Sequence, residues 1–306
     1  MLKANISSIT RLRINEDGPG VRSVIFMCGC PLNCVWCCNP EICLSKRFRT
    51  LSFDELYQYI AKDIPYFVNS GGGITFSGGE PLLHTNYLMG FINQYCDNFS
   101  VAVETSLYTD ISNIKALSPM IDRWYIDFKL FDEKKHIEYT GVSNEPIKSN
   151  LRYLASEIDK EKITITYPMI PGVNTSDENL YDMMTFLSEL GIQSIELHPY
   201  RKFQEQKHKD VGLEPTVIDE ISSELYGTIK YNFLNNGFVI PERNLYREKE
   251  KCKYLKAIRK QLCADETIPL EIKDCTFEGR CVGTCPQCEY ELKFINEWGK
   301  NHDETM

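Results

Sequence analysis

The distribution of cysteine constrains this chain more than any other feature of its sequence. Thirteen cysteines occur in 306 residues: six from Cys28 to Cys43, six from Cys252 to Cys288, and Cys96 between the two groups. An odd number of cysteines in a chain of this length does not indicate a disulfide framework. Two dense groups at opposite ends of the chain instead predict metal or iron–sulfur chemistry.

The overall composition is that of a folded, acidic protein. Apolar residues make up 42% of the chain, which is enough for a buried core. The formal charge of −9 argues against a general nucleic-acid binder, whose affinity comes from basic patches. No run approaches the ~20 apolar residues of a membrane span, and the first residues lack the apolar core of a signal peptide. We therefore expect a cytoplasmic protein that binds neither membrane nor nucleic acid.

Strand-like and helix-like patterns alternate from Val21 to about Leu197. About six β/α units of this kind predict an α/β fold in which helices wrap a parallel sheet. In such folds the functional residues lie at the carboxyl ends of the strands. The expected strands are Val21–Met27, Gly73–Phe76, Val101–Val103, Trp124–Phe128, Ile163–Ile170 and Ile195–His198.

The pattern changes beyond about Pro241. Residues Arg243–Lys260 are rich in charge and are expected to form a helix, whereas Asp274–Tyr290 is short, turn-rich and loaded with cysteine. We therefore predict two units: a β/α domain over residues 1–245, and a small Cys-rich metal-binding appendage over residues 246–306.

The cysteine motif of the first group has the spacing C-x3-C-x2-C, formed by Cys30, Cys34 and Cys37. Three thiolates on one short loop can hold three irons of a [4Fe–4S] cube and leave the fourth iron open to a small molecule. The alternative is a structural zinc site, which needs a fourth ligand. Neighbouring cysteines that could complete such a zinc site are Cys28, Cys38 and Cys43.

A glycine-rich segment, Gly71–Pro81, contains Gly78-Gly79-Glu80 directly after the second expected strand. No G-K-[ST] follows, so a phosphate-binding P-loop is not indicated. The bland alternative is a plain tight turn, although glycines in such a loop also allow a close approach of the backbone to another group.

Taken together, the cysteine triplet and the Gly-Gly-Glu element resemble the radical S-adenosylmethionine (SAM) superfamily. Further elements narrow the resemblance to the glycyl-radical-enzyme activating enzymes, the group of pyruvate formate-lyase activase. The resemblance covers roughly residues 5–215 at several points in the same order. The elements that carry it are Asp17–Arg22, Asp127–Lys129, Tyr139–Asn144, Ile170–Asn174 and Leu197–Tyr200.

This resemblance implies a partial (β/α)6 barrel of the radical SAM type. It also implies an iron–sulfur enzyme that reductively cleaves S-adenosylmethionine to a 5′-deoxyadenosyl radical. The radical abstracts a hydrogen from a glycine of a partner glycyl radical enzyme. The implied cofactors are a [4Fe–4S] cluster, S-adenosylmethionine and a monovalent cation, and the implied electron donor is of the flavodoxin or ferredoxin type.

The resemblance also assigns roles to single residues. Cys30, Cys34 and Cys37 would ligate the cluster, with Trp36 as the superfamily's aromatic residue beside the third cysteine. Gly78, Gly79 and Glu80 would hold the methionine amine. The residues that would surround the ribose and carboxylate of the cofactor, or bind the cation, are Glu104, Thr105, Asp127 and Lys129. Asp17 would contact the glycyl peptide of the partner.

Three features depart from the family pattern. Thr166 occupies the place of an arginine that often binds the cofactor from the fifth strand, and Arg201 replaces the histidine of a Pro-Tyr-His element. Only about 33 residues separate Cys37 from Gly71, so the ferredoxin-like insert of many relatives is absent.

The second cysteine group predicts a second metal centre. Cys275, Cys281, Cys285 and Cys288 offer four thiolates, which would fill an auxiliary [4Fe–4S] cluster or a zinc site and leave no place for the cofactor. Two other functions stay open, the first of them because peptide-modifying relatives in the superfamily also carry C-terminal cysteine-rich domains. One is a radical SAM maturase that modifies a peptide or protein, and the other is a non-catalytic iron–sulfur or zinc protein.

Overall fold

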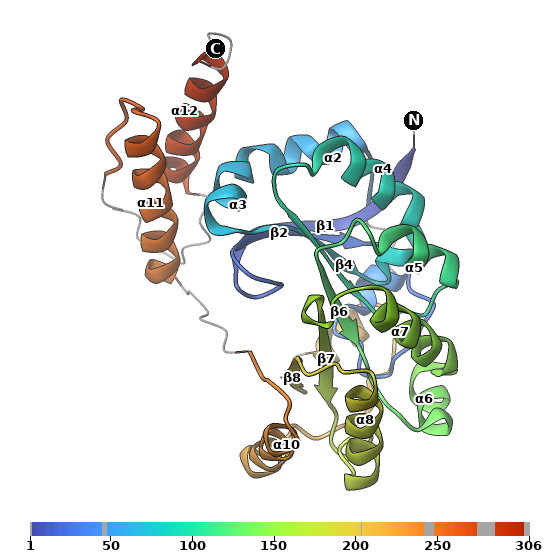
Figure 1. The fold of residues 1–306 in the computed structure, drawn as a ribbon. Coiled ribbons are helices and arrows are strands. Elements are labelled where there is room, and N and C mark those ends of the chain that lie inside the picture. The colour runs from blue at the N-terminus through green and yellow to red at the C-terminus, as the bar shows by residue number, and fades with distance from the viewer. Residues whose placement is uncertain (1, 45–47, 203, 242–247, 274–284, 303–306) are drawn as a thin grey trace.

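The computed structural model describes residues 2–44, 48–202, 204–241, 248–273 and 285–302, and Figure 1 shows how they fold. Within these residues a single sheet of eight strands has the order β3-β1-β2-β4-β5-β6-β7-β8. The six strands from β2 to β8 in this order run parallel, and this confirms the predicted partial (β/α)6 barrel. The strands are β1 (Lys3–Ile14), β2 (Val21–Met27), β3 (Arg49–Ser52), β4 (Gly73–Gly78), β5 (Ser100–Thr105), β6 (Arg123–Asp127), β7 (Ile163–Met169) and β8 (Ile195–Pro199).

Helices connect the parallel strands and cover the outer side of the sheet (Figure 1). Short 3-10 helices occur at η1 (Ala61–Asp63), η2 (Pro81–His84) and η3 (Lys160–Lys162). The α-helices are α1 (Pro40–Leu44), α2 (Phe53–Ile60), α3 (Ile64–Ser70), α4 (Thr85–Tyr95), α5 (Ile111–Leu117), α6 (Glu133–Thr140), α7 (Glu145–Glu157), α8 (Asp177–Glu189), α9 (Gln204–Asp210), α10 (Ser223–Asn235), α11 (Glu248–Asp265) and α12 (Pro286–His302).

Local sequence signals explain several helix ends. Ser52 and Glu55 form the capping box that their spacing predicts at the start of α2. The Ser176 hydroxyl accepts a hydrogen bond from the Asn179 amide and caps α8. Helix α6 ends at Gly141, whose φ of +80° is a left-handed conformation that favours glycine.

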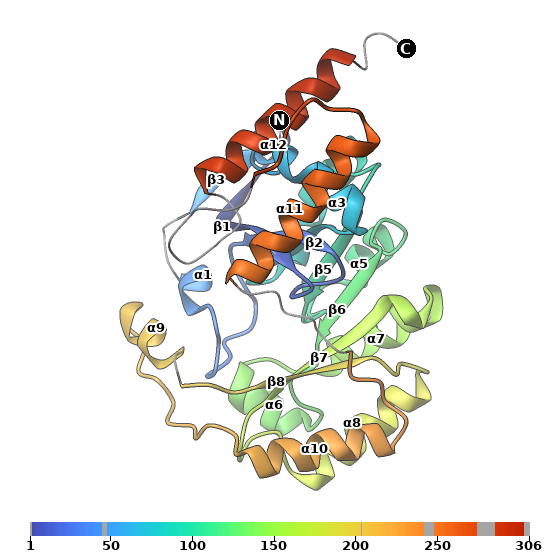
Figure 2. The same cartoon turned by 90° about the vertical axis from the view of Figure 1, so that its left-hand side faces the viewer.

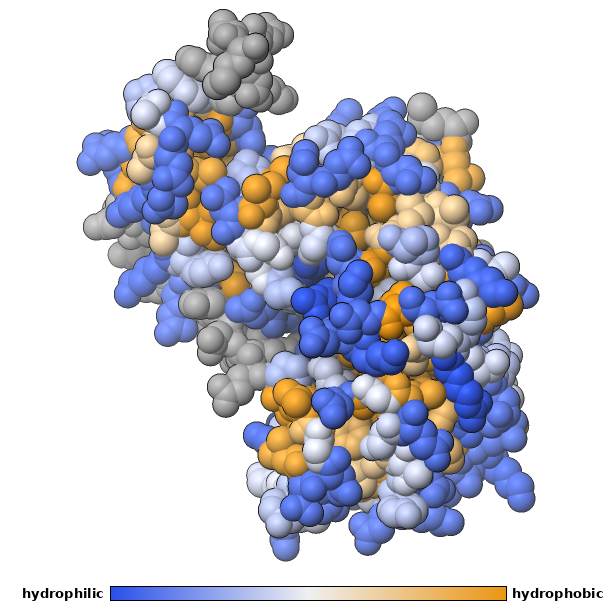
Figure 3. All heavy atoms as spheres, in the orientation of Figure 1, coloured by the Kyte–Doolittle hydropathy of each residue, from blue (hydrophilic) through white to orange (hydrophobic). Residues whose placement is uncertain are grey.

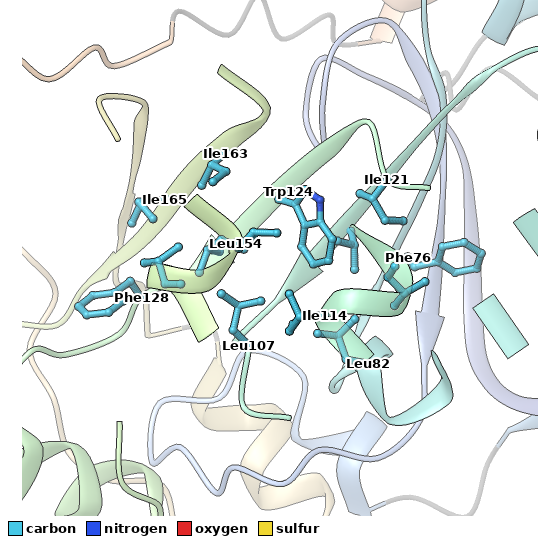
Figure 4. Packing of buried hydrophobic residues seen from close by; sticks show 14 of the residues in the cluster. Phe76, Leu82, Leu107, Ile114, Ile121, Trp124, Phe128, Leu154, Ile163 and Ile165 are labelled. Atoms are coloured by element: carbon cyan, nitrogen blue, oxygen red, sulfur yellow. The ribbon is translucent and has the colours of Figure 1, made fainter. Parts of the chain in front are cut away.

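The main hydrophobic core lies between the parallel strands and their helices. Trp124 of β6 is fully buried at its centre. Figure 4 shows its neighbours, and each fully buried side chain of this size stabilises the fold by about 1.5–3 kcal/mol. They include Phe76 of β4 and Ile163 of β7, together with Leu107, Ile114 and Leu154 from the connecting segments.

The structure differs from the expected elements in three places. Strands β1 and β3 were not expected, and they extend the sheet by antiparallel pairing on the side of β2. Helix α11 is described over Glu248–Asp265, so the helix expected to end at Lys260 continues to Asp265, and the first expected residues, 243–247, lie outside the described residues. The predicted turn-rich segment ends earlier than Tyr290, because α12 begins at Pro286. Residues 274–284, and with them Cys275 and Cys281, lie outside the described residues.

Helices α11 and α12 form a hairpin that packs beside α3 and β1 (Figures 1 and 2). Hydrophobic side chains are visible where this hairpin meets α3 in Figure 3. The buried contact joins two sets of apolar residues. The barrel supplies Leu12, Ile14, Val21 and Tyr66, and the hairpin supplies Leu255, Ile258, Leu262 and Leu292.

Ion pairs surround this apolar contact. Arg11 on β1 binds Asp63 through two bonds of 2.7 and 2.6 Å, and it also binds Glu289 of α12 at 3.1 Å. Lys62 binds the other oxygen of Glu289 at 3.0 Å. The hairpin is therefore fixed to the barrel by both apolar and charged contacts. Within the described ranges, no helix is long and apolar enough to cross a membrane.

Candidate active site

The predicted site residues come together at the carboxyl ends of the parallel strands. Met27 of β2 pairs with Gly78 of β4, and Asp127 of β6 pairs with Thr166 of β7. Glu104 and Thr105 complete β5 between them. The loop with the three motif cysteines begins directly after β2, so it lies at the same edge of the sheet.

The cysteine loop is held on one side by the end of α6. The amide of Asn33 donates to the carbonyl of Thr140 at 2.7 Å, and the amide of Val35 donates to the carbonyl of Tyr139 at 3.0 Å. Trp36 is buried, and its ring centroid lies 6.1 Å from that of Tyr139. Trp36 thus anchors the loop by packing, which gives the predicted cofactor-site aromatic residue a structural role.

Helix α9 holds the same loop from the other side. The Nε2 atom of His208 lies 3.0 Å from the carbonyl oxygen of Cys37. The Nζ atom of Lys207 donates to the carbonyl of Cys38 at 2.9 Å and to side-chain oxygens of Asn39 and Glu41 at 3.0 Å each. Neither residue belongs to a motif that the sequence analysis singled out, because they lie about 170 positions away along the chain.

The motif thiols have different environments. Burial raises the pKa of Cys34 to about 12. A hydrogen bond with the Cys43 thiol lowers the pKa of Cys37 to about 7, and the same partner lowers the pKa of Cys30. The positive charge of Lys129 acts on all three motif thiols and favours their thiolate forms.

The three motif thiols suit an iron–sulfur cluster, whose irons take thiolate ligands. Across the part of the chain that the structure describes, no three His, Cys, Asp or Glu side chains converge on a point that one metal ion could occupy. A [4Fe–4S] cube offers each thiolate a separate iron, so its ligands need not share one centre. Cys30, Cys34 and Cys37 on one loop beside an ammonium group therefore fit a cube.

The two predicted glycines are required by the packing of the chain itself. A Cβ on Gly79 would lie 2.0 Å from the carbonyl oxygen of Gly29, and Gly78 has a φ of +117°. The Gly79 amide donates to Met27 at 2.9 Å, and the Glu80 amide donates to Gly29 at 2.8 Å. The Gly-Gly-Glu turn is thus fastened to the start of the cysteine loop.

Glu80 is fully buried, and both of its carboxylate oxygens accept hydrogen bonds from the chain. Oε1 accepts from the Leu82 amide at 3.1 Å and from the Thr105 hydroxyl at 2.6 Å. Oε2 accepts from the amide and hydroxyl of Ser106 at 2.9 and 2.6 Å. Burial raises the pKa of Glu80. Glu80 and Thr105 therefore join η2 to the end of β5, and their direct contact with a cofactor stays a prediction.

Glu104 faces a different environment from Glu80. Its Oε2 atom accepts a hydrogen bond of 2.5 Å from the hydroxyl of Ser77. Burial, reinforced by the negative charges of Asp17 and Asp127, raises the pKa of Glu104 to about 7. A carboxylate held among other carboxylates is suited to bind a cation.

Asp127 and Lys129 form an ion pair at the end of β6, with Nζ and Oδ2 2.7 Å apart. Burial raises the pKa of Asp127. The charge of Lys129 and the hydrogen bonds from Lys129 and Thr166 lower it by more, so the pKa of Asp127 lies below its ordinary value. Thr166, the first of the departures from the family pattern noted above, thus donates to Asp127. The other departure, Arg201, lies 3.7 Å from Glu220 in an exposed ion pair.

A buried arginine supports the Asp17 loop. Arg22 is fully buried and donates to the hydroxyls of Thr75 and Ser100 at 2.7 Å each, while the Thr75 hydroxyl donates to the Asp17 carbonyl at 2.8 Å. Burial lowers the pKa of Arg22 to about 10. The motif Asp17–Arg22 contained this residue, but only the structure shows that it braces the loop that presents Asp17.

Two of the four predicted cysteines of the second centre are described. Cys285 and Cys288 hydrogen-bond each other at the start of α12, and Arg259 of α11 donates to the Cys288 sulfur at 3.4 Å. Burial raises the pKa of Cys288 to about 11. Arg259 is itself fully buried and also binds Glu291 at 2.9 Å.

Comparison with known proteins extends these observations. The profile of the Radical SAM superfamily matches residues 24–184. Among solved structures, the chain resembles a radical SAM methyltransferase from Sphaerobacter thermophilus, with a TM-score of 0.53, 17% identity and 76% of each chain covered. It also resembles Streptococcus suis SuiB bound to the precursor peptide SuiA, with a TM-score of 0.54 and 14% identity, over 73% of this chain and 49% of that one. At such identities these structures support the fold alone.

Curated relatives are more informative than these structures. The trans-4-hydroxy-L-proline dehydratase activating enzyme of Clostridioides difficile is 33% identical over 73% of this chain and 94% of its own length. The pyruvate formate-lyase-activating enzyme of Staphylococcus epidermidis is 30% identical over 76% of this chain and 97% of its own length. These matches favour an activating enzyme over a peptide maturase or a non-catalytic protein. The chain therefore belongs to the radical SAM superfamily and, within it, to the activating enzymes of glycyl radical enzymes.

Proposed function

We propose that Cys30, Cys34 and Cys37 hold a [4Fe–4S] cluster whose open iron binds S-adenosylmethionine. When both are bound, they supply a 5′-deoxyadenosyl radical by one-electron reductive cleavage of the cofactor. The observation that carries this proposal is the three-thiol loop itself, which is locked between α6 and α9 beside the ammonium group of Lys129.

Lys129 and Asp127 are suited to bind the polar groups of the cofactor. Lys129 supplies a positive charge for the cofactor carboxylate, and its bond to Asp127 fixes the direction of the ammonium group. Glu104 and Asp127 would accept from the ribose hydroxyls or hold a monovalent cation. Thr105 would contribute through its position between Glu104 and Ser106, since its hydroxyl already donates to Glu80.

The Gly78-Gly79-Glu80 turn would receive the methionine amine. Both glycines pack directly against the backbone of Met27 and Gly29, where a Cβ would not fit, and this fixes the position of the turn that would receive the amine. The contacts of Glu80 with Leu82, Thr105 and Ser106 support a role in fixing the turn as well as in attracting the cofactor's positive charge.

The partner would be a glycyl radical enzyme that presents a glycine near Asp17. The relatives are named for a hydroxyproline dehydratase and for pyruvate formate-lyase, and a partner of the same broad class is proposed for this chain. The reducing electron would come from a flavodoxin- or ferredoxin-type protein. An oxygen-sensitive cluster and 13 cysteines suit the reducing cytoplasm, where we place the protein.

Residues 246–306 would form a separate unit with its own centre. We propose that Cys285 and Cys288 bind iron–sulfur or zinc together with Cys275 and Cys281. The Cys285–Cys288 contact beside Arg259 supports this, because a cation stabilises adjacent thiolates.

Anaerobic reconstitution followed by electron paramagnetic resonance tests the proposal. The reduced protein should change its cluster spectrum on addition of S-adenosylmethionine and should generate a glycyl radical on a suitable partner. Cys34→Ala should abolish both responses, whereas Cys96→Ala, outside the site, should keep them. A full response from the Cys34→Ala protein would refute the ligand assignment.

A further inference from the structure

A fourth cysteine lies against the motif thiols. Cys43 on α1 stands outside the C-x3-C-x2-C spacing, yet its thiol hydrogen-bonds the sulfurs of both Cys30 and Cys37. Two of the three proposed cluster ligands therefore share contact with one further thiol, to which the proposed function assigns no role.

The residues before Cys43 are fixed by contacts from two directions. Lys207 of α9 binds the side chains of Asn39 and Glu41. Ile42 is buried, and its carbonyl accepts a hydrogen bond of 3.4 Å from the amide of Gly29. Because α1 is anchored both to α9 and to the start of the cysteine loop, the approach of Cys43 to the motif thiols follows from the fold.

We propose that Cys43 is the protein's own ligand for the fourth iron when S-adenosylmethionine is absent, and that the cofactor displaces it. This inference rests on the proposed ligand set of Cys30, Cys34 and Cys37. A [4Fe–4S] cube ordinarily takes four thiolates, and three motif cysteines leave one iron without a protein ligand. A nearby thiol can fill that position, and Cys43 belongs to the same group of sulfur atoms.

The exchange balances without any change of oxidation state. Cys43 releases its thiol proton to solvent when its sulfur binds iron, and the departing thiolate takes a proton back when the cofactor arrives. The cofactor can compete because its amine and carboxylate bind as a pair, assisted by Lys129. Cys43 would thus protect the open iron during the part of the cycle in which no cofactor is bound.

Oxidative loss of the fourth iron tests this role without any assay of activity. The full-length, reconstituted protein is treated with ferricyanide in the absence of S-adenosylmethionine, and the [3Fe–4S] signal is quantified by electron paramagnetic resonance. Cys43→Ala should give a several-fold larger signal than the unmodified protein, and Cys96→Ala should match the unmodified protein. Any C-terminal cluster contributes equally to all three samples, so the difference reports on the first site. Equal signals would overturn the proposal.

A second measurement needs no variant and guards against poor folding of Cys43→Ala. Iodoacetamide labelling of Cys43 in the reconstituted unmodified protein, read by mass spectrometry, should increase several-fold when S-adenosylmethionine is added. Unchanged labelling would mean that Cys43 is not a displaceable ligand, even if it hydrogen-bonds the cluster thiolates. A cluster that persists in Cys34→Ala would instead refute the proposed ligand set, so the two failures are distinguishable.

Discussion

Glu80 and Glu104 are neighbouring carboxylates at the same edge of the sheet, and their different hydrogen-bond partners give them different roles. Glu80 has no exposed surface and accepts four hydrogen bonds from Leu82, Thr105 and Ser106. Glu104 accepts from Ser77 and lies among other acidic groups. Glu80 therefore stabilises the backbone around the site, whereas Glu104 remains suited to a positively charged ligand.

Replacing Glu80 should lower stability as well as cofactor affinity. Glu80→Ala leaves several buried donors without an acceptor, at a cost of about 1–3 kcal/mol each, so we expect a loss of roughly 3 kcal/mol or more in the free energy of unfolding. Denaturant unfolding and an S-adenosylmethionine binding isotherm of the reconstituted protein measure the two effects. Glu80→Gln, which keeps one acceptor oxygen, should lose less. Unchanged unfolding in Glu80→Ala would contradict the bracing role of this carboxylate.

Glu104 should make stability depend on pH between about 4.5 and 7. Its pKa is raised to about 7 from the ordinary value of 4.5, so the native state holds this proton more tightly than the unfolded state does. The free energy of unfolding contributed by Glu104 should therefore fall as pH rises through this window. Glu104→Gln should flatten that slope in denaturant unfolding at several pH values.

The matched control for this pH dependence is Glu55→Gln. Glu55 lies in the capping box of α2, where hydrogen bonds from Ser52 lower its pKa. Its contribution is present above pH 4.5 and disappears below, so the slope between pH 5 and 7 should stay as in the unmodified protein. An identical profile for Glu104→Gln and Glu55→Gln would show that Glu104 does not titrate in this range.

At the scale of elements, the six parallel strands were predictable because each is a short apolar run between turn residues. Strand β1 carries a different signal, since Lys3–Ile14 alternates polar and apolar residues as a half-buried strand does, and it was missed beside the continuous apolar runs of the parallel strands. Its inward side chains Leu12 and Ile14 pack on the α11–α12 hairpin. Helix α12 was not predicted either, because the cysteines at its start suggested a turn-rich segment.

In the site, too, local sequence patterns were predictable, whereas contacts between residues distant in the sequence were not. The C-x3-C-x2-C triplet and the Gly-Gly-Glu turn are local patterns, so the sequence analysis could place them at strand ends. The contacts of α9 with the cysteine loop, and that of Cys43 with Cys30 and Cys37, arise only when the chain is folded. No spacing rule links His208 to Cys37, because the barrel and not the local sequence sets their separation.

Helix α9 should prove necessary for a properly held cluster. His208→Ala removes the ring nitrogen that contacts the Cys37 carbonyl, and it should lower iron retention and alter the line shape of the reduced cluster. His208→Gln, whose amide can donate to the same carbonyl, should restore much of both. Iron analysis after gel filtration and electron paramagnetic resonance are the measurements. Failure of both variants to differ from the unmodified protein would leave α9 without a positioning role.

On the scale of the whole molecule, the C-terminal hairpin is joined to the barrel by a polar path. Arg259 of α11 donates to the hydroxyl of Tyr66 on α3, to Glu291 and to the sulfur of Cys288. It has no exposed surface, so its charge must be balanced by these partners. The proposed second centre would therefore form where the hairpin contacts the barrel, apart from the strand ends at which the cofactor is proposed to bind.

The double variant Cys285→Ser, Cys288→Ser tests this second centre while preserving the hairpin. Serine is a favourable N-cap residue for α12 at position 285, and at position 288 it can accept the hydrogen bond of Arg259. We expect the variant to fold, to bind less iron or zinc, and to keep the response of its N-terminal cluster to S-adenosylmethionine. Cys263→Ala, which removes a buried thiol among Ile268, Ile272 and Ile295, should keep the full metal content. If the double variant also keeps the full metal content, Cys285 and Cys288 are not metal ligands. The hairpin would then be held by its apolar contacts and by those of Arg259 alone.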